Sequence, residues 1–527
     1  MKTKKLLFLG VCIFLLCVGL VGCVSHSLDP EKLSLQSNIP DATEPPSSAS
    51  AETELPTEAA TNASTDAPTE TLTEVPTEAM TEAPTEPVTE ATTESPEELE
   101  AKKQEMMKEI YDAADTIQLP IGGWSTPASV LRDGYTGKEG SYDKVFDLIA
   151  ASGINYMITL EEWSSGSWPL ESLSSAHKAG IKLWYNCVGQ SAGYSLEKIN
   201  ALLSSAHADA LTAIYVKDEP TLGDISELAE LTAELRAGLG GDFDRPVFSN
   251  LLPTYASSGM IGKDYRAYVR SYLDATKPDR LMFDYYPYQA GSGDSLPAMI
   301  ANIAMAREEA AKDGIELYTY IQSSANPSIR EPNLEELNLN AHLNLAMGVK
   351  GIAYFLVCEH YDGWDYTNMI DYEGNPTPMY DKIKAVNEGL NAMKGVYLAY
   401  DFDGLMLANY PKGSAALTSA QCTTEIQTHE NGYLASVTAG SNRSQIATGC
   451  FTHTEAEGEA GYYLVNLNYK ANSKITLTFS EAVTYQLWGS EGLEDMGNIS
   501  VDADGNYTLS LTLSKGEGIF LKVSKAQ

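Results

Sequence analysis

Acidic residues stand at three points of the chain where an apolar run ends, and carboxyl groups placed in this way can do acid–base chemistry. Residues 215–220 read Tyr-Val-Lys-Asp-Glu-Pro, so Asp218 and Glu219 close one such run. Asp284 ends a second run and is followed by Tyr-Tyr-Pro-Tyr, while Glu359 follows a third. Hydrolysis of a glycosidic bond needs two carboxyl groups, one as acid and one as nucleophile or base. Asp218, Glu219, Asp284 and Glu359 are therefore candidate carboxyl groups for such a pair.

Each acid also has a structural alternative. Asp218 or Glu219 could cap a following helix, where the helix dipole stabilises a negative charge. Asp284 could be bonded to backbone, although an acid on an apolar run beside three tyrosines is an unusual surface charge. Glu359 fits a solvated loop better than a catalytic position, so Asp284 is the best candidate for the second role. Two further acids after an apolar run are possible substitutes: Glu161 and Glu162.

Aromatic and amide side chains gather near the same run ends. Aromatic rings pack on the C–H faces of sugars while their polar edges hydrogen-bond, and amides bind hydroxyl groups. The candidates for sugar contact are Asp218, Trp124, Trp163, Tyr185, Asn186, Asn250, Tyr286, Gln322 and Trp364. A single aromatic of this kind usually belongs to a core, and Trp184, which points opposite to Tyr185, is interpreted as packing. Several together favour a carbohydrate cleft.

Short apolar strands alternate with amphipathic helices from about residue 103 to 395. The expected strands are 119–124, 156–160, 182–187, 213–216, 246–251, 280–284, 316–321 and 351–356. The expected helices, with apolar spacing of i, i+3 and i+4, are 142–152, 170–179, 196–206, 225–239, 264–275, 296–312, 334–347 and 379–393. Eight units predict a (β/α)8 barrel over 101–396, with its active site at the C-terminal ends of the strands. The rival, a doubly wound open sheet, would carry a Gly-rich phosphate loop after its first strand, and none is present.

The barrel resembles the retaining glycoside hydrolases of the large (β/α)8 clan that includes β-galactosidases and cellulases. An Asn-Glu or Asp-Glu pair ends strand four in that clan, often with proline next. The resemblance makes Glu219 the general acid/base and Asp218 the residue that touches the sugar 2-hydroxyl. The clan's nucleophile ends strand seven, where this chain has Gln322. An amide can be neither nucleophile nor base, so this departure leaves the retaining mechanism open.

A second resemblance lies after the expected eighth strand. Residues 371–380 read Asp-Tyr-Glu-Gly-Asn-Pro-Thr-Pro-Met-Tyr. This looks like the Asp-Gly-x-Pro-Thr-Pro segment that leads into the last barrel helix of some β-galactosidase-like glycosidases, and it supports the same assignment.

The hydrophobic period changes to two from about residue 398, which indicates β-structure. The expected strands are 462–468, 474–479, 483–487, 507–513 and 518–523. Residues 397–527 resemble the β-sandwich that follows many glycosidase barrels and should pack on the barrel; an independent carbohydrate-binding module is the alternative. Cys422 and Cys450 both fall here and could pair or remain thiols.

The N-terminus has the pattern of a leader and an anchor. Basic residues precede an apolar run of signal-peptide length, and the run ends Leu-Val-Gly-Cys at Cys23. Residues 1–23 resemble a bacterial lipoprotein signal with a lipobox, which implies lipidation of Cys23 and attachment to the membrane; an ordinary cleaved signal is the alternative. Residues 24–100 are rich in Thr, Glu and Pro, which predicts a disordered, extended linker. We therefore expect a cell-surface protein that faces outwards.

Charge and composition narrow the functional classes. The 527-residue chain has a formal net charge of −37, which disfavours nucleic acid as a partner. Seven scattered histidines and no paired cysteine motif predict no metal site, and no cofactor is expected. The prediction is a hydrolase of O-glycosidic bonds in an extracellular oligo- or polysaccharide. The alternative is a catalytically inactive carbohydrate-binding lipoprotein on a degenerate barrel, which Gln322 motivates.

Overall fold

The residues that the computed structural model describes all belong to one compact unit of the chain, Ser95–Gln527. The described residues are 101–102, 104–105, 118–125, 141–159, 168–187, 195–240, 243–291, 293–358, 365–371, 373–410, 432–441 and 444–526. The predicted leader, the lipidation site Cys23 and the linker up to residue 100 lie outside this range. Among the described residues, no helix is both long and apolar enough to cross a bilayer.

Eight parallel strands close into a barrel in strict sequence order, which confirms the predicted fold class. The strands are β1 (Ile121–Trp124), β2 (Tyr156–Ile158), β3 (Lys182–Asn186), β4 (Leu211–Asp218), β5 (Val247–Leu251), β6 (Arg280–Phe283), β7 (Glu316–Gln322) and β8 (Gly351–Phe355). Pairing of β1 with β8 completes the ring, so no strand of the barrel is an edge. The rival open sheet is excluded.

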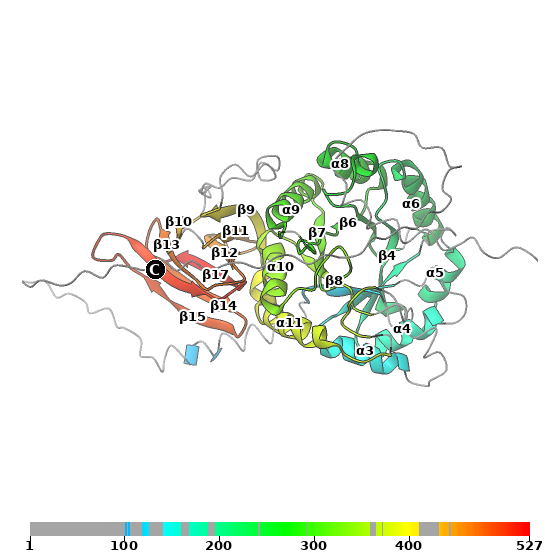
Figure 1. The fold of residues 1–527 in the computed structure, drawn as a ribbon, viewed down its shortest axis with the longest axis horizontal. Helices are drawn as coiled ribbons and strands as arrows, with labels where there is room; N and C mark the ends of the chain where they lie inside the picture. Colours follow the sequence, from blue (N-terminus) through cyan, green and yellow to red (C-terminus); the bar gives the residue numbers. More distant parts are fainter. Residues whose placement is uncertain are drawn as a thin grey trace, which may run out of the picture. The chain divides into compact units, whose positions relative to one another are not determined.

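Helices surround the barrel (Figure 1). They are α3 (Ser141–Ala151), α4 (Trp168–Lys178), α5 (Leu196–Leu203), α6 (Ile225–Leu239), the short α7 (Ser258–Ile261), α8 (Tyr265–Thr276), α9 (Leu296–Ala311), α10 (Leu334–Ala346) and α11 (Pro378–Tyr397). Side-chain caps fix several of their starts. Asp264 accepts hydrogen bonds from the backbone of α8, and Asn333 forms a capping box with Glu336 on α10. Such caps explain why the helices begin close to the predicted residues.

An aromatic layer fills the barrel interior. Its large members are Trp124, Tyr156, Trp184, Tyr215, Phe248, Tyr318 and Tyr320. Tyr156 stacks on Trp184 with ring centroids 3.7 Å apart, which confirms that Trp184 is a packing residue. Glycine makes room for these rings, since a Cβ at Gly122 would lie 2.1 Å from the Tyr156 ring and one at Gly351 2.1 Å from that of Tyr318. The barrel is thus solid below its C-terminal mouth.

The C-terminal domain is a β-sandwich of two antiparallel sheets. One sheet has the order β10-β13-β16 and the other β15-β14-β17-β12-β11-β9. The strands are β9 (Tyr400–Ala408), β10 (Leu434–Ala439), β11 (Ile446–His453), β12 (Glu459–Asn466), β13 (Ser473–Phe479), β14 (Val483–Gly489), β15 (Gly492–Ile499), β16 (Tyr507–Leu513) and β17 (Gly518–Lys525). Sequence reasoning missed β9, β10, β11 and β15. Cys450 is buried with its sulfur 3.3 Å from that of Met406, while Cys422 lies outside the described residues.

The sandwich packs on helices α10 and α11 of the barrel (Figure 1). Tyr463, Trp488 and Phe520 from the sandwich belong to the same hydrophobic core as the helix layer of the barrel. His342 of α10 lies within 2.8 Å of the Tyr463 hydroxyl, and burial lowers the pKa of His342 to about 4. A continuous core of this kind is typical of two domains that form one body.

Candidate active site

Polar side chains meet at the C-terminal ends of three neighbouring strands. Asp218 is the last residue of β4, Asn250 lies in β5, and Asp284 comes directly after β6. The register pairs Asp218 with Asn250 and Asn250 with Met282. Because Met282 belongs to the barrel interior and side chains alternate along a strand, Asp284 also points inwards. The three side chains therefore share the mouth of the barrel.

Asn250 joins the two aspartates. Its Nδ2 donates to Asp284 Oδ1 at 3.0 Å and to Asp218 Oδ1 at 3.2 Å. The hydroxyl of Tyr215 donates to the same oxygen of Asp218 at 2.5 Å. The two aspartates thus accept hydrogen bonds from Asn250 of β5 and, at Asp218, from Tyr215 of the aromatic layer.

Glu219 is held in an unusual backbone conformation. Its φ is +47°, a left-handed value that a residue with a side chain rarely adopts. The Glu219 N–H donates to the carbonyl of Asn250 at 2.9 Å, and the Tyr268 hydroxyl donates to the carbonyl of Pro220 at 2.5 Å. Strain that is held in place by surrounding bonds is a feature of functional sites. The local conformation aims the Glu219 carboxyl at Asp284 instead of along the strand.

Glu219 and Asp284 form a carboxyl pair joined by a hydrogen bond. Burial, reinforced by the charges of Asp284 and Asp218, raises the pKa of Glu219 well above its usual value. Burial and the charge of Asp218 raise the pKa of Asp284 to about 7, while the hydrogen bonds from Asn250 and Glu219 oppose the rise. Because burial and like charges raise both pKa values, the two carboxyl groups titrate as a pair that holds a proton more firmly than isolated carboxyl groups do.

Asp218 differs from its two acidic neighbours. Its side chain is exposed at the barrel mouth, whereas Asp284 is 3% exposed. The barrel wall still crowds it, so burial raises the pKa of Asp218, but the hydrogen bonds from Tyr215 and Asn250 lower it. These two donors make Asp218 the member of the cluster best suited to carry a full negative charge.

Aromatic rings border the carboxyl pair on two sides. Tyr286 is half-buried and lies 5.2 Å from the ring of Phe355, which in turn lies 5.7 Å from the ring of Tyr366. Tyr255, in the loop after β5, is 45% exposed, and its ring lies 5.1 Å from that of Tyr285. Burial of the hydroxyl, followed by the charges of Asp284 and Glu219, raises the pKa of Tyr255. Tyr255 thus offers an exposed ring near the carboxyl pair.

Tyr255 was missed by sequence reasoning. It stands in a loop that carries no recognised motif, and its neighbours Leu-Pro-Thr gave no chemical signal. The rule that barrel sites are built from the loops after the strands could have flagged it.

Two predicted contact residues prove to be core. Tyr185 packs in the layer between the barrel and its helices, because it alternates with Trp184, whose ring fills the interior. Trp124 is 8% exposed and packs against Tyr215 at 5.7 Å and Tyr320 at 6.1 Å. The prediction that the Tyr185 ring offers a face to a sugar is wrong, whereas sugar contact by Trp124 stays a prediction. Asn186 is buried at the end of β3 and paired in register with Tyr215, and a role in binding stays a prediction.

Gln322 lies where the resembled clan carries its nucleophile, and its amide is used by backbone. Its oxygen accepts from the N–H of Tyr288 at 2.9 Å. Its Nε2 donates to the carbonyls of Tyr288 at 3.0 Å and Arg330 at 2.8 Å. With no exposed surface, Gln322 joins the loops after β6 and β7 and is not a substrate-binding residue. That prediction is corrected, and a glutamate could not make the two donor bonds.

The segment that begins at Asp371 forms a turn that leads into helix α11. Asp371 Oδ1 accepts from the backbone N–H groups of Glu373 at 2.9 Å and Asn375 at 2.8 Å. Thr377 caps α11 and Pro378 takes its first position.

Three predicted site residues, Glu359, Trp163 and Trp364, lie outside the described residues, as do Glu161 and Glu162. Within the described part of the chain, no three His, Cys, Asp or Glu side chains converge so as to hold a metal ion.

No protein-family model and no curated protein matches the chain. Solved structures do match it. The polyextremophilic β-galactosidase from the Antarctic haloarchaeon Halorubrum lacusprofundi is 9% identical over 77% of this chain and 99% of that one, with a TM-score of 0.42. The GH39 enzyme from Xanthomonas axonopodis pv. citri is 8% identical over 78% and 96%, with a TM-score of 0.36. The endo-β-1,4-mannanase from Thermotoga petrophila is 12% identical over 66% and 94%, also at 0.36. The (β/α)8 assignment itself rests on the strand pairing within this chain.

Proposed function

We propose that this protein is a glycoside hydrolase, with Glu219 as its acid and Asp284 as its second carboxylate. One observation carries the proposal: two carboxyl groups at the ends of β4 and β6 share a hydrogen bond, and both have raised pKa values. Buried titratable groups with strongly shifted pKa values that lie beside one another are typical of acid–base sites. The pair also lies at the end of the barrel where (β/α)8 enzymes carry their active sites.

The proposed roles follow from the resemblance of the strand-four motif and from the raised pKa values of the pair. Glu219 delivers a proton to the leaving oxygen, while Asp284 acts as a carboxylate on the anomeric carbon or on an attacking water. A hydrogen-bonded pair is closer than the roughly 5–5.5 Å of retaining or 6.5–9.5 Å of inverting enzymes. The substrate must therefore enter between Glu219 and Asp284 and separate them.

The surroundings favour a neutral or cationic sugar. Three acids, Asp218, Glu219 and Asp284, meet in one network, and they would repel a uronic acid or a sulfated sugar. The exposed ring of Tyr255 supplies a face on which a sugar can pack. Asp218, bonded by Tyr215 and Asn250, remains able to accept a hydrogen bond from a sugar hydroxyl.

The N-terminal pattern supports an extracellular location for the proposed activity. A lipid at Cys23 would hold the protein to the membrane, and the acidic linker would extend the barrel away from it. Such an arrangement suits a large extracellular saccharide. Labelling with radioactive palmitate, lost in Cys23→Ser, tests the anchor; an unlabelled parent protein would contradict it.

Hydrolysis of a panel of plant and host polysaccharides and aryl glycosides tests the enzyme. We expect the parent to release sugar and Glu219→Gln to lose at least about a hundredfold in kcat/KM, because the substitution removes the proton donor. Glu331→Gln is the matched control, since Glu331 is exposed and pairs with Lys382 at 2.8 Å away from the cluster. A parent that binds a glycan but cleaves none would contradict the proposal and favour the binding protein.

A further inference from the structure

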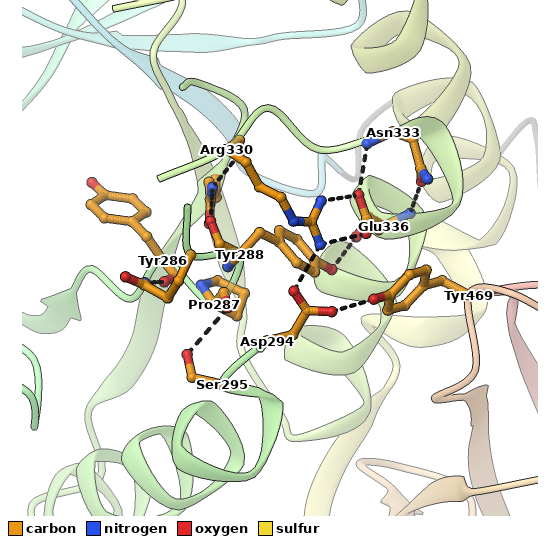
Figure 2. A network of polar contacts seen from close by, with 11 residues as sticks. Tyr286, Pro287, Tyr288, Asp294, Ser295, Arg330, Asn333, Glu336 and Tyr469 are labelled. Carbon is orange, nitrogen blue, oxygen red and sulfur yellow. Dashed lines mark hydrogen bonds and ion pairs between the residues drawn. The ribbon is translucent and has the colours of Figure 1, made fainter. Parts of the chain in front are cut away.

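A partly buried polar network joins the loop after β6 to the C-terminal domain (Figure 2). Its centre is Arg330, in the segment between β7 and α10. The guanidinium bonds Asp294 Oδ1 at 2.7 Å and both carboxylate oxygens of Glu336 at 2.7 Å each. The hydrogen bonds with Glu336 are the main cause that raises the pKa of Arg330. The forked, planar cation therefore fixes two acids from two different elements at once.

Tyr288 lies under this cation, and its hydroxyl, backbone N–H and backbone carbonyl all form hydrogen bonds. The Arg330 guanidinium stands 5.0 Å above the Tyr288 ring. The hydroxyl of Tyr288 donates to the carbonyl of Glu336 at 2.6 Å, and its backbone N–H and carbonyl are both bonded by Gln322. The Arg330 N–H adds a third backbone bond, to the same carbonyl, at 3.0 Å.

The sandwich contributes the last member of the network. Tyr469, in the loop between β12 and β13, donates its hydroxyl to Asp294 Oδ2. Its ring also meets Tyr288 edge-on, with centroids 6.4 Å apart. Asp294 is thereby shared between Arg330 of the barrel and Tyr469 of the sandwich (Figure 2).

Only three residues separate Tyr288 from Asp284. One of them is Pro287, which limits the backbone, and its carbonyl accepts from the Ser295 N–H at 2.9 Å. A chain this short transmits the position of Tyr288 to Asp284. The depth at which Asp284 sits in the barrel mouth then depends on how firmly Tyr288 is held.

We propose that Arg330 and Tyr469 are positioning residues that, through Asp294 and Tyr288, hold Asp284 in its dry contact with Glu219. This inference rests on the proposed function of the pair. It makes the C-terminal domain a structural part of the active site, and not an independent carbohydrate-binding module.

Two mild substitutions in the full chain test the proposal. Tyr469→Phe removes one hydroxyl, and Arg330→Lys keeps the charge but loses the fork. Loosening of Tyr288 lets water reach Asp284, so we expect its pKa, about 7 in the parent, to fall by about one pH unit. The acid limb of the kcat/KM profile should move with it, with kcat reduced about tenfold. A purely structural role would lower stability without moving either the limb or the pKa.

Arg270→Lys is the matched control, because Arg270 also binds two acids, Asp274 of α8 and Asp313 in the turn after α9. The pKa is read by carboxyl 13C titration of aspartate-labelled protein, with Asp284→Asn to assign the signal. The proposal is overturned if neither variant moves the pKa of Asp284, or if Arg270→Lys moves it equally. A shift of this pKa in a parent that hydrolyses no glycan would uphold the positioning role while the proposed function fails.

Discussion

Strands β6 and β7 are neighbours in the barrel, and each presents a buried polar side chain at its C-terminal end. Gln322, at the end of β7, uses its oxygen and both N–H groups on the backbone of two loops. Asp284, after β6, accepts from Asn250 and otherwise faces the acids Glu219 and Asp218. A polar group whose bonding capacity is used by its own chain is structural. One that is surrounded by like charges destabilises the fold and is retained at functional sites.

This contrast accounts for the departure from the resembled clan. Strand seven of this chain has no room for a nucleophile, because its inward amide joins the loops that carry Tyr288 and Arg330. The second carboxylate stands one strand earlier, next to β5 and within reach of Glu219.

The largest effect is expected at Asp284. Asp284→Asn keeps the hydrogen-bonding shape but removes the charge, so kcat/KM should fall about a thousandfold while the free energy of unfolding stays the same or rises. Steady-state kinetics and urea unfolding measure the two quantities. Retention of more than a third of the parent's activity would show that Asp284 is not the second carboxylate.

Gln322→Glu tests whether the side chain at the end of β7 is structural. The carboxylate would lose two donor bonds and face the carbonyls of Tyr288 and Arg330, so the free energy of unfolding should fall by about 3 kcal/mol. Gln322→Met, which removes the bonds without adding charge, separates the two causes. A folded, more active Gln322→Glu protein would mean that the strand-seven position is available for catalysis.

The pH dependence should follow the carboxyl pair. The raised pKa of Asp284, about 7, means that the folded state binds more protons than the unfolded state between about pH 4 and 7. The contribution of this group to stability is therefore largest below about pH 4 and is lost as the pH rises through about 7. Urea unfolding across this range should show a weaker decline in Asp284→Asn than in the parent; equal slopes would argue against the shift.

Activity should depend on pH in the opposite direction. Asp284 must be ionised and Glu219 protonated, so kcat/KM should fall below about pH 7. The limb should be absent from the residual activity of Asp284→Asn. A flat profile between pH 5 and 8, roughly the range in which an ordinary carboxylate is already ionised, would contradict the assignment.

The smallest effect is expected at Tyr255. Tyr255→Ala removes an exposed ring beside the pair, so KM should rise about fivefold with kcat little changed, as expected for a stacking contact worth about 1 kcal/mol. Tyr255→Phe keeps the ring and should stay near the parent. Leu170→Ala, another exposed apolar side chain, is the control, and an unchanged KM in Tyr255→Ala would remove this residue from the site.

The sequence was sufficient to predict the barrel and the positions of three acids at the ends of its strands. Eight apolar runs of strand length, separated by helical periods, predict eight strands, and Asp218, Glu219 and Asp284 fall where those runs end. The sandwich was only half recognised. Strand β15, which reads Gly-Leu-Glu-Asp-Met-Gly-Asn-Ile, has no simple alternation, because much of its length is only partly buried.

The side chains that were misassigned or missed have directions and partners that only the three-dimensional structure determines. Alternation places Trp184 and Tyr185 on opposite faces, but only barrel closure decides that Trp184 points inwards. The partners of Gln322 are backbone groups of two loops, which no local pattern announces. Tyr255 acquires its place only because the β5 loop folds back beside Tyr285.

The most direct test of the central claim is chemical rescue of Asp284→Ala on a substrate that the parent hydrolyses. If Asp284 is the second carboxylate, the variant is inactive, and added azide or formate occupies the vacated space and restores cleavage at least about tenfold. The same anions should not change the rate of Gln322→Ala. Full activity of Asp284→Ala without added anion, or rescue of Gln322→Ala instead, would contradict the account.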